Sequence, residues 1–203
     1  MIKKIAIAVA VIGIIFYSLQ GTRIDASAYA AQLRKSRSEK NRGFRQSPES
    51  PIPEAQRARF DSLNYYSAEV SFVVEAALSH NAHPDTTLIQ MSDNRAEKYL
   101  RWGQAKFRID AQAQQLAVYL KADGKDSTLF VPFTDLTNGH DTYGGGRYLD
   151  VPRPAPEAKT AELDFNRAYN PFCAYNNAYN CPVPPAENRL QVAIRAGEKA
   201  FHE

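Results

Sequence analysis

The segment "AKFRIDAQAQQLAVYLKADGKDSTLFVPF", residues 105–133, decides the fold. Apolar side chains occupy every second position in two of its runs: Ala105, Phe107 and Ile109, then Leu116, Val118 and Leu120. Alternation with a period of two predicts strands that bury one face. An Asp-Gly pair at 123–124 predicts a tight turn before the apolar run 128–133. The segment therefore predicts antiparallel strands joined by short turns.

The same alternation recurs on both sides of this segment. The further runs are residues 68–78, 86–91, 147–151, 162–169 and 189–197. No long helical pattern separates them, which argues against parallel strands joined by helices. About eight strands are predicted, and their short spacing is typical of an antiparallel β-barrel or sandwich.

The residues before the strands have a different pattern. Residues 26–45 are rich in helix formers and contain no proline, which predicts a helix, and a short helix is expected after Pro53. Residues 34–60 carry eight Lys or Arg against three Glu. Such a basic stretch either lies on anionic lipid head groups or is a solvated helix face.

The first residues predict a membrane attachment. Two lysines precede an apolar run, residues 5–19, which is shorter than the roughly 20 residues of a full span but suits a signal anchor. We expect an anchor or signal over 1–21, a basic helical segment over 22–60 and a β-rich domain over 61–203. The domain is expected outside the cytoplasmic membrane, tethered to it, or secreted or periplasmic if the signal is cleaved.

Several function classes find no support in the sequence. Residues 61–203 hold eighteen acidic against fourteen basic side chains and no base-reading motif, so no nucleic acid partner is expected. The phosphate-binding loop, dinucleotide and HExxH patterns are absent, and no cofactor is predicted. The four histidines lack zinc-ligand spacing, and no metal is predicted.

The segment "HDTYGGGRYLDV", residues 140–151, is the most unusual. Three successive glycines predict a bulge, a barrel corner or a place where a ligand approaches the backbone. Arg147 shares a strand face with apolar residues, and Arg167 does so in the run 162–169. A buried guanidinium needs a carboxylate, carbonyl groups or an anionic ligand. The sequence leaves open whether the partner is an internal acid, such as Asp135, or a ligand.

These residues suggest three functions. The first is a binding domain that holds a small anionic or polar ligand in a pocket. Its expected ligand-binding residues are Tyr143, Gly144, Gly145, Gly146, Arg147, Tyr148, Asn166, Arg167, Tyr169, Asn188 and Arg189. The second is a hydrolase in which Asp135, His140 or Asp141 is the acid or base and the arginines hold the substrate. The third is a structural envelope protein with ion-paired arginines and a protein partner.

Cys173 and Cys181 frame the segment "CAYNNAYNC". Outside the cytoplasm, an even pair of cysteines at this spacing predicts a disulfide. Closure of so short a loop would contribute about 2–3 kcal/mol in the chain-entropy estimate.

Two long blocks carry a family resemblance. Residues 129–151 and 163–199 resemble the signature blocks of the domain-of-unknown-function 1684 family, and residues 47–52, 60–67 and 97–107 are also similar to it. The resemblance covers about residues 34 to 200. It implies a β-rich domain and no particular chemistry. The family's marked positions would fall on Asp135, Gly139, 143–150, 164–171, Cys173, Cys181 and 184–189, which include all of the candidate ligand-binding residues.

Overall fold

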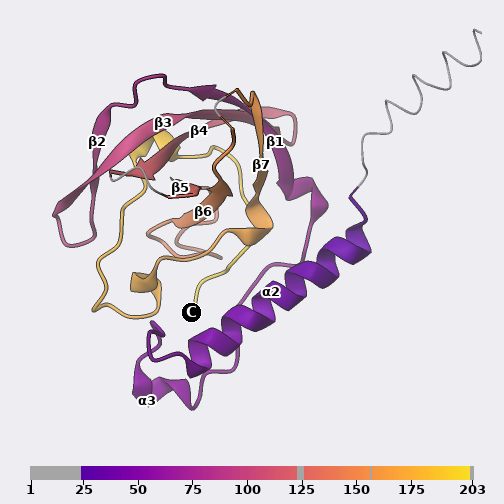
Figure 1. The fold of residues 1–203 in the computed structure, drawn as a ribbon. Helices are drawn as coiled ribbons and strands as arrows, with labels where there is room; N and C mark the ends of the chain where they lie inside the picture. The colour runs from indigo at the N-terminus through magenta and orange to yellow at the C-terminus, as the bar shows by residue number, and fades with distance from the viewer. Residues whose placement is uncertain (1–23, 123–125, 156, 202–203) are drawn as a thin grey trace, which may run out of the picture.

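The computed structural model describes residues 24–122, 126–155 and 157–201, which form a curled antiparallel sheet with a long helix beside it (Figure 1). The sheet order is β6-β5-β4-β3-β1-β7, and β2 pairs with β3 outside this path. The strands are β1 (Val73–His80), β2 (Thr86–Gln90), β3 (Ala96–Ile109), β4 (Gln112–Lys121), β5 (Thr128–Phe133), β6 (Arg147–Pro152) and β7 (Thr160–Asp164).

A pair of tyrosines nearly closes the sheet into a barrel. The amide of Tyr148 in β6 donates to the carbonyl of Tyr169, and the amide of Tyr169 donates to the carbonyl of Tyr148, both at 2.9 Å. Tyr169 lies a few residues beyond β7, so this bridge joins the two ends of the strand order. Pairing the outer strands leaves fewer unsatisfied backbone groups at an edge.

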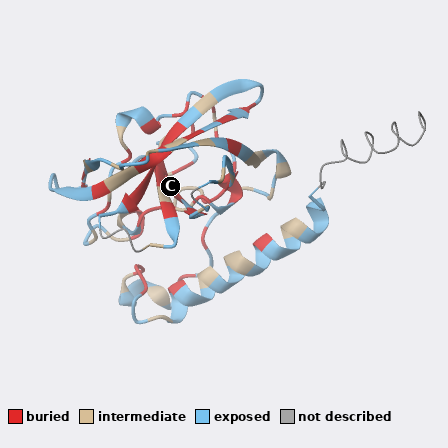
Figure 2. Cartoon of the chain, turned by 45° about the horizontal axis from the view of Figure 1, so that its top comes forward, coloured by how far each residue is buried: buried red, intermediate tan, exposed pale blue. Residues whose placement is uncertain are grey.

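The barrel interior is filled as the alternation predicts. The six apolar residues singled out in β3 and β4 are all buried, together with Leu149 and Val151 of β6. Buried positions alternate with exposed ones at the end of β3, whereas β4 has five successive buried residues because its outer face is covered as well (Figure 2). The antiparallel fold is therefore confirmed, and the architecture is a nearly closed barrel.

The strand count and two strand ends differ from the prediction. The described residues form seven strands. Residues 189–197 make one isolated bridge, between Arg189 and Thr134, and form no strand, although Leu190, Val192, Ile194 and Ala196 are buried. Alternation reports which side chains are buried and does not reveal whether the backbone pairs. The run 162–169 leaves the sheet at Asp164, and the run 68–78 enters it only at Val73.

The predicted helix is confirmed as α2 (Ala26–Gln46), and a short helix, α3 (Glu54–Arg57), comes after it. The Asp25 side chain caps α2 by accepting from two of its first amides. Tyr29 on α2 donates to Asp164 at 2.7 Å, and the Lys40 ammonium meets Glu198 at 2.5 Å. The 3-10 turns are Val70–Phe72, Phe165–Arg167, Phe172–Ala174 and Ala186–Asn188.

A second apolar cluster joins the end of α2 to the loop that follows the 3-10 turn Phe172–Ala174. It consists of Phe44, Ile52, Phe60, Leu63 and Tyr175. The Phe44 and Tyr175 rings meet edge to face with centroids 5.1 Å apart. The helix is thus fastened by packing at one end and by polar contacts along its length.

The expected membrane anchor, residues 5–19, lies outside the described residues. Within the described ranges, no helix combines the length and the apolar character needed to cross a bilayer.

The third glycine of the triplet is required by its backbone. Gly146 has a φ of +89°, a region that side chains rarely tolerate. A Cβ there would lie 2.6 Å from Cγ of Pro184 and 2.8 Å from the Phe133 carbonyl oxygen. Around Gly144, by contrast, the nearest atom to an added Cβ would be 3.7 Å away. The triplet therefore begins as an open loop and ends at a tightly packed entry to β6.

We expect Gly146→Ala to lower the free energy of unfolding by about 1–3 kcal/mol, since both the strained φ and the close contacts oppose a side chain. The matched Gly144→Ala should change it by less than about 0.5 kcal/mol. Urea unfolding of both variants measures the difference. Equal effects would contradict the assignment of the strained position to Gly146.

Candidate functional site

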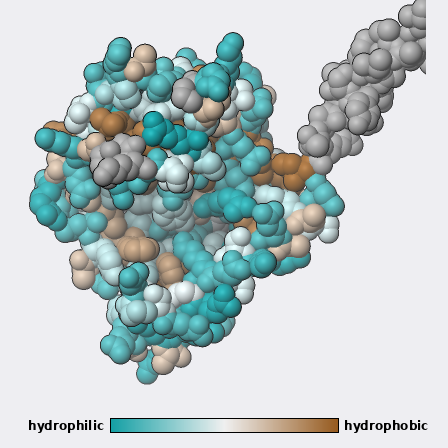
Figure 3. Space-filling view, in the orientation of Figure 1, coloured by the Kyte–Doolittle hydropathy of each residue, from teal (hydrophilic) through white to brown (hydrophobic). Residues whose placement is uncertain are grey.

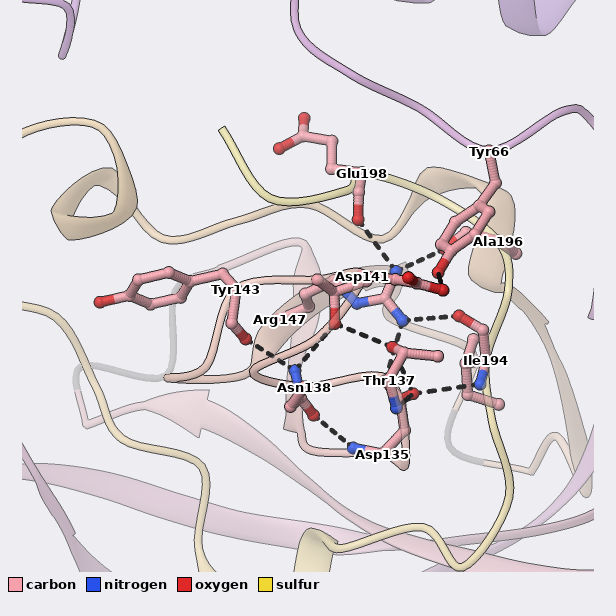
Figure 4. A network of polar contacts seen from close by, with 11 residues as sticks. Tyr66, Asp135, Thr137, Asn138, Asp141, Tyr143, Arg147, Ile194, Ala196 and Glu198 are labelled. Carbon is pink, nitrogen blue, oxygen red and sulfur yellow. Dashed lines mark hydrogen bonds and ion pairs between the residues drawn. The ribbon is translucent and has the colours of Figure 1, made fainter. Parts of the chain in front are cut away.

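The Arg147 side chain enters the barrel interior and has no solvent exposure. Its Nη2 donates to Oδ2 of Asp135 at 2.8 Å and to the carbonyl of Ile194 at 2.8 Å (Figure 4). Its Nη1 donates to the carbonyls of Ala196, at 2.5 Å, and Glu198, at 3.1 Å. Arginine suits this role because its planar group presents several donors in fixed directions.

The Asp135 carboxylate is equally occupied. Its Oδ1 accepts from the amide of Thr137 at 2.8 Å, from the Thr137 hydroxyl at 2.6 Å and from the amide of Ile194 at 3.1 Å. The structure therefore contains the ion-pair alternative for Arg147, with Asp135 as the acid. With both side chains fully buried, Arg147 is not placed to hold a ligand and Asp135 is not placed to exchange protons with a substrate.

Arg167 does not enter the interior, which corrects the prediction that it shares a strand face with Leu163. The strand ends at Asp164, whose carboxylate accepts from the amide of Asn166 at 3.1 Å and starts a 3-10 turn. This turn carries Arg167 outward, with its side chain 44% exposed and its Nε donating to Asp164 at 2.9 Å.

The best candidate site is a pocket beside the closing bridge, which we call the aromatic pocket. It has a volume of about 410 Å³. Both unusual segments contribute to it: Tyr148 and Asp150 from the first, Tyr169 and Pro171 from the second. The described lining is completed by Tyr99, Lys121, Asp126, Thr128, Phe130, Phe172, Tyr179, Asn180, Cys181 and Pro182.

The walls of the aromatic pocket are rings, and three pairs of them meet edge to face. Tyr148 lies between Phe130, with centroids 4.8 Å apart, and Tyr169, with centroids 5.8 Å apart. Phe172 and Tyr179 form the third pair at 5.3 Å. The Tyr148 hydroxyl is fixed by donation to the carbonyl of Pro182. These contacts hold the walls in place without filling the pocket.

The rim of the aromatic pocket is slightly acidic. Asp150 and Asp126 face Lys121, so two carboxylates accompany one ammonium group. Asp150 keeps contact with solvent, yet desolvation by its neighbours raises the pKa of its carboxyl. The Tyr169 hydroxyl, which donates to Asp150 at 2.9 Å, opposes that shift. Burial raises the pKa of Tyr148 and Tyr169, so both hydroxyls remain protonated at neutral pH.

The other predicted ligand-binding residues are distributed over separate pockets. Tyr143 and Gly144 line a pocket of about 690 Å³ at the glycine loop, and Arg189 lines another of about 620 Å³. Asn166 and Arg167 line a crevice of about 200 Å³ against α2, which Tyr169 also lines. The structure therefore does not bring the predicted set together in a single site.

Four of the predicted residues line none of these pockets: Gly145, Gly146, Arg147 and Asn188. The buried Asn188 amide bridges strands, because its Oδ1 accepts from the amide of Ala117 at 2.7 Å and its Nδ2 donates to the carbonyls of Ala117 and Pro132. Its role is structural. The side chain of Asn188 substitutes for backbone hydrogen bonds between β4 and β5, which explains why an amide is buried there.

The comparisons with known proteins agree with the resemblance. The family model "Protein of unknown function (DUF1684)" matches residues 58–199. This chain belongs to the DUF1684 family. The match begins after residues 47–52, so that block of the resemblance lies outside it. The solution NMR structure of an uncharacterized protein from gene locus rrnAC0354 of Haloarcula marismortui is similar, with 37% identity and a TM-score of 0.70, over 88% of this chain and 98% of that one. No curated protein matches this chain.

The sequence did not reveal most of the aromatic pocket. Tyr99, Phe130, Phe172 and Tyr179 come from segments far apart in the sequence, and an aromatic residue in a strand is more often core than binding site. Glu198, which is almost fully buried and pairs with Lys40, could have been predicted from the sequence as an inward-facing residue. It continues by one step the alternation of Val192, Ile194 and Ala196.

The two predicted catalytic candidates besides Asp135 lie elsewhere. His140 and Asp141 line the glycine-loop pocket together with Lys199. The Asp141 carboxylate accepts from the Tyr66 hydroxyl at 3.0 Å. Among the residues that the structure describes, no group of three His, Cys, Asp or Glu side chains is placed to hold a metal ion.

The cysteines are free thiols in the structure, so the predicted disulfide is not formed. They nevertheless lie together: the amide of Cys173 donates to Sγ of Cys181 at 3.1 Å. A hydrogen bond from the Cys181 thiol lowers the pKa of Cys173 to about 7, with help from the Tyr143 hydroxyl. The same contact, with burial, raises the pKa of Cys181.

We expect iodoacetamide to alkylate Cys173 well before Cys181, because the thiolate is the nucleophile and Cys181 is buried with a raised pKa. The rate at Cys173 should rise with pH through a midpoint of about 7, below the roughly 8.5 of an ordinary cysteine. Peptide mapping after timed alkylation measures both rates. Tyr143→Phe should move the midpoint upward, and equal rates at the two cysteines would contradict the geometry.

Proposed function

We propose that this DUF1684 domain binds a small neutral or cationic organic ligand in the aromatic pocket, with residues 5–19 as its expected membrane attachment. The volume of about 410 Å³ suits a small molecule, since ligand sites typically measure about 300–1,000 Å³. The pocket lies between the two segments at which a ligand site was expected.

The observation that carries this proposal is the combination of ring walls with an acidic rim. Ring faces attract cations and pack against flat apolar groups, so they suit a ligand with a planar or aliphatic body. Asp150 is the candidate acceptor for an amine or hydroxyl of the ligand. The Tyr169 hydroxyl donates to its carboxylate and holds it at the rim of the pocket. Desolvation by its neighbours raises the pKa of the Asp150 carboxyl, and a hydrogen-bond donor on the ligand would offset this loss of solvation.

The proposal departs from an anion held by Arg147. That guanidinium is already paired with Asp135, and the rim of the aromatic pocket would repel a carboxylate ligand. Ion-paired arginines are also what the structural-protein alternative expects. The aromatic pocket favours the binding function, because a purely structural domain needs no ring-lined pocket between its sheet and the loop 169–182.

Hydrolysis is the second candidate, and one observation favours it. His140 and Asp141 line a pocket of about 690 Å³ that Lys199 also reaches. The pair could supply an acid or base. The Tyr66 hydroxyl already donates to Asp141, which supports a positioned carboxylate.

Three matched probes test the binding function: benzylamine, benzyl alcohol and benzoate, titrated into isotope-labelled protein and followed by amide chemical shifts. We expect saturable shifts near Tyr148 and Asp150 for benzylamine, weaker ones for benzyl alcohol and the weakest for benzoate. Tyr179→Ala removes one wall and should weaken benzylamine binding at least fivefold. Asp150→Asn should reduce the preference for benzylamine over benzyl alcohol, because it removes the charge and keeps the shape.

Tyr66→Phe is the control, since Tyr66 donates to Asp141 outside the aromatic pocket and its loss should leave benzylamine binding unchanged. Absence of saturable shifts with all three probes would reject the proposed site. Equal binding of all three in the Tyr179→Ala and native proteins would reject it as well.

A further inference from the structure

A second site lies where α2 meets the barrel. This α2 crevice has a volume of about 200 Å³, small for an organic ligand but ample for a single ionic group. Two cations on the helix, Arg37 and Lys40, converge on it, and Arg167 reaches it from the turn after β7. The side of the molecule that carries α2 is mostly hydrophilic in Figure 3.

The charges around the α2 crevice do not balance. Lys40 is paired with Glu198 at 2.5 Å, and Arg167 is paired with Asp164 at 2.9 Å. Arg37 has no carboxylate within ion-pair distance among the described residues. Three cations therefore face two carboxylates, and one positive charge is left over.

Arg37 is the one of the three without a carboxylate partner among the described residues. Its Nη1 donates to the carbonyl of Tyr66 at 2.8 Å and its Nη2 to the carbonyl of Asn166 at 3.3 Å. Its guanidinium lies over the Tyr65 ring, 4.4 Å from the centroid. Its Nε–H is buried and has no hydrogen-bond partner in the described part of the chain. The Nε–H groups of Arg101 and Arg147 are likewise buried without a partner within the described ranges, so the missing carboxylate is what sets Arg37 apart.

Arg167 keeps donors in reserve. Only its Nε is engaged, by Asp164, and its two terminal nitrogens have no hydrogen-bond partner within the described ranges. Its side chain is 44% exposed, so these nitrogens can reach an incoming group without disturbing the core. The terminal nitrogens of an arginine suit two-point contact with a phosphate.

We propose that the α2 crevice binds a phosphate group, held by Arg37, Lys40 and Arg167. Such an anion would balance the surplus charge. Because Arg37 and Lys40 belong to the helix and Arg167 to the barrel, the anion would also fasten α2 in place. The phosphate can belong to a soluble compound or to a lipid head group, since both present the same oxygens.

The site is separate from the aromatic pocket, although Tyr169 lies on both. The Lys40 ammonium is 5.0 Å from the centroid of the Tyr169 ring, whose hydroxyl bonds Asp150 in the aromatic pocket. The aromatic pocket has an acidic rim and suits a cation, whereas the α2 crevice carries a surplus positive charge and suits an anion. The phosphate proposal therefore stands or falls independently of the benzylamine test.

The test titrates the full chain at constant ionic strength with inorganic phosphate, and separately with dihexanoyl phosphatidylglycerol below its micelle concentration. Amide shifts of α2 and of residues 165–169 report binding. We expect saturable shifts that Arg167→Gln weakens at least fivefold. Arg34→Gln is the matched control, because Arg34 is an exposed residue of α2 outside the crevice, and it should bind as the native protein does.

Binding of inorganic phosphate with this dependence on Arg167 supports a soluble source. Binding of the lipid alone with the same dependence supports a head group. Absence of saturable shifts with both probes overturns the proposal, as does an equal loss in Arg34→Gln and Arg167→Gln, which would indicate attraction by general charge. Circular dichroism confirms that α2 remains folded in each variant.

Discussion

The rest of the structure depends on a single buried ion pair, Arg147 with Asp135. A guanidinium inside a barrel is costly unless a carboxylate and carbonyl oxygens surround it. Here the carboxylate comes from the segment after β5, and three carbonyls come from residues 194–198. The pair thereby ties β6 to two segments that lie outside the sheet. The C-terminal residues can enter the barrel because Arg147 satisfies their backbone.

This pairing leaves Arg147 unavailable to a ligand. The two binding sites that we propose lie instead on either side of Tyr169. One is ring-walled and acidic at its rim, and the other is small and cationic. Tyr169 also makes the bridge to Tyr148 that nearly closes the barrel. Closure of the fold and formation of both candidate sites thus involve the same residue.

The local pattern of the sequence was sufficient for much of the fold. Alternation in residues 105–133 predicted two buried strand faces correctly, and helix formers in 26–45 predicted α2. It also placed Arg147 inside, but it could not choose between Asp135 and a ligand, since that choice depends on contacts between distant segments. Arg167 was misplaced because a single side chain, Asp164, ends the strand and starts a turn that carries the arginine outward. The walls of the aromatic pocket were not predicted, because they too depend on contacts between distant segments of the chain.

The most direct test of this account is the stability of Asp135→Asn in urea. The change keeps the shape of the side chain and leaves the guanidinium of Arg147 buried without its counterion. We predict a loss of about 3–5 kcal/mol in the free energy of unfolding. Asp61→Asn, which breaks the exposed pair with Arg45, serves as the control and should change little. An effect of Asp135→Asn as small as that of the control would contradict the central role of the buried pair.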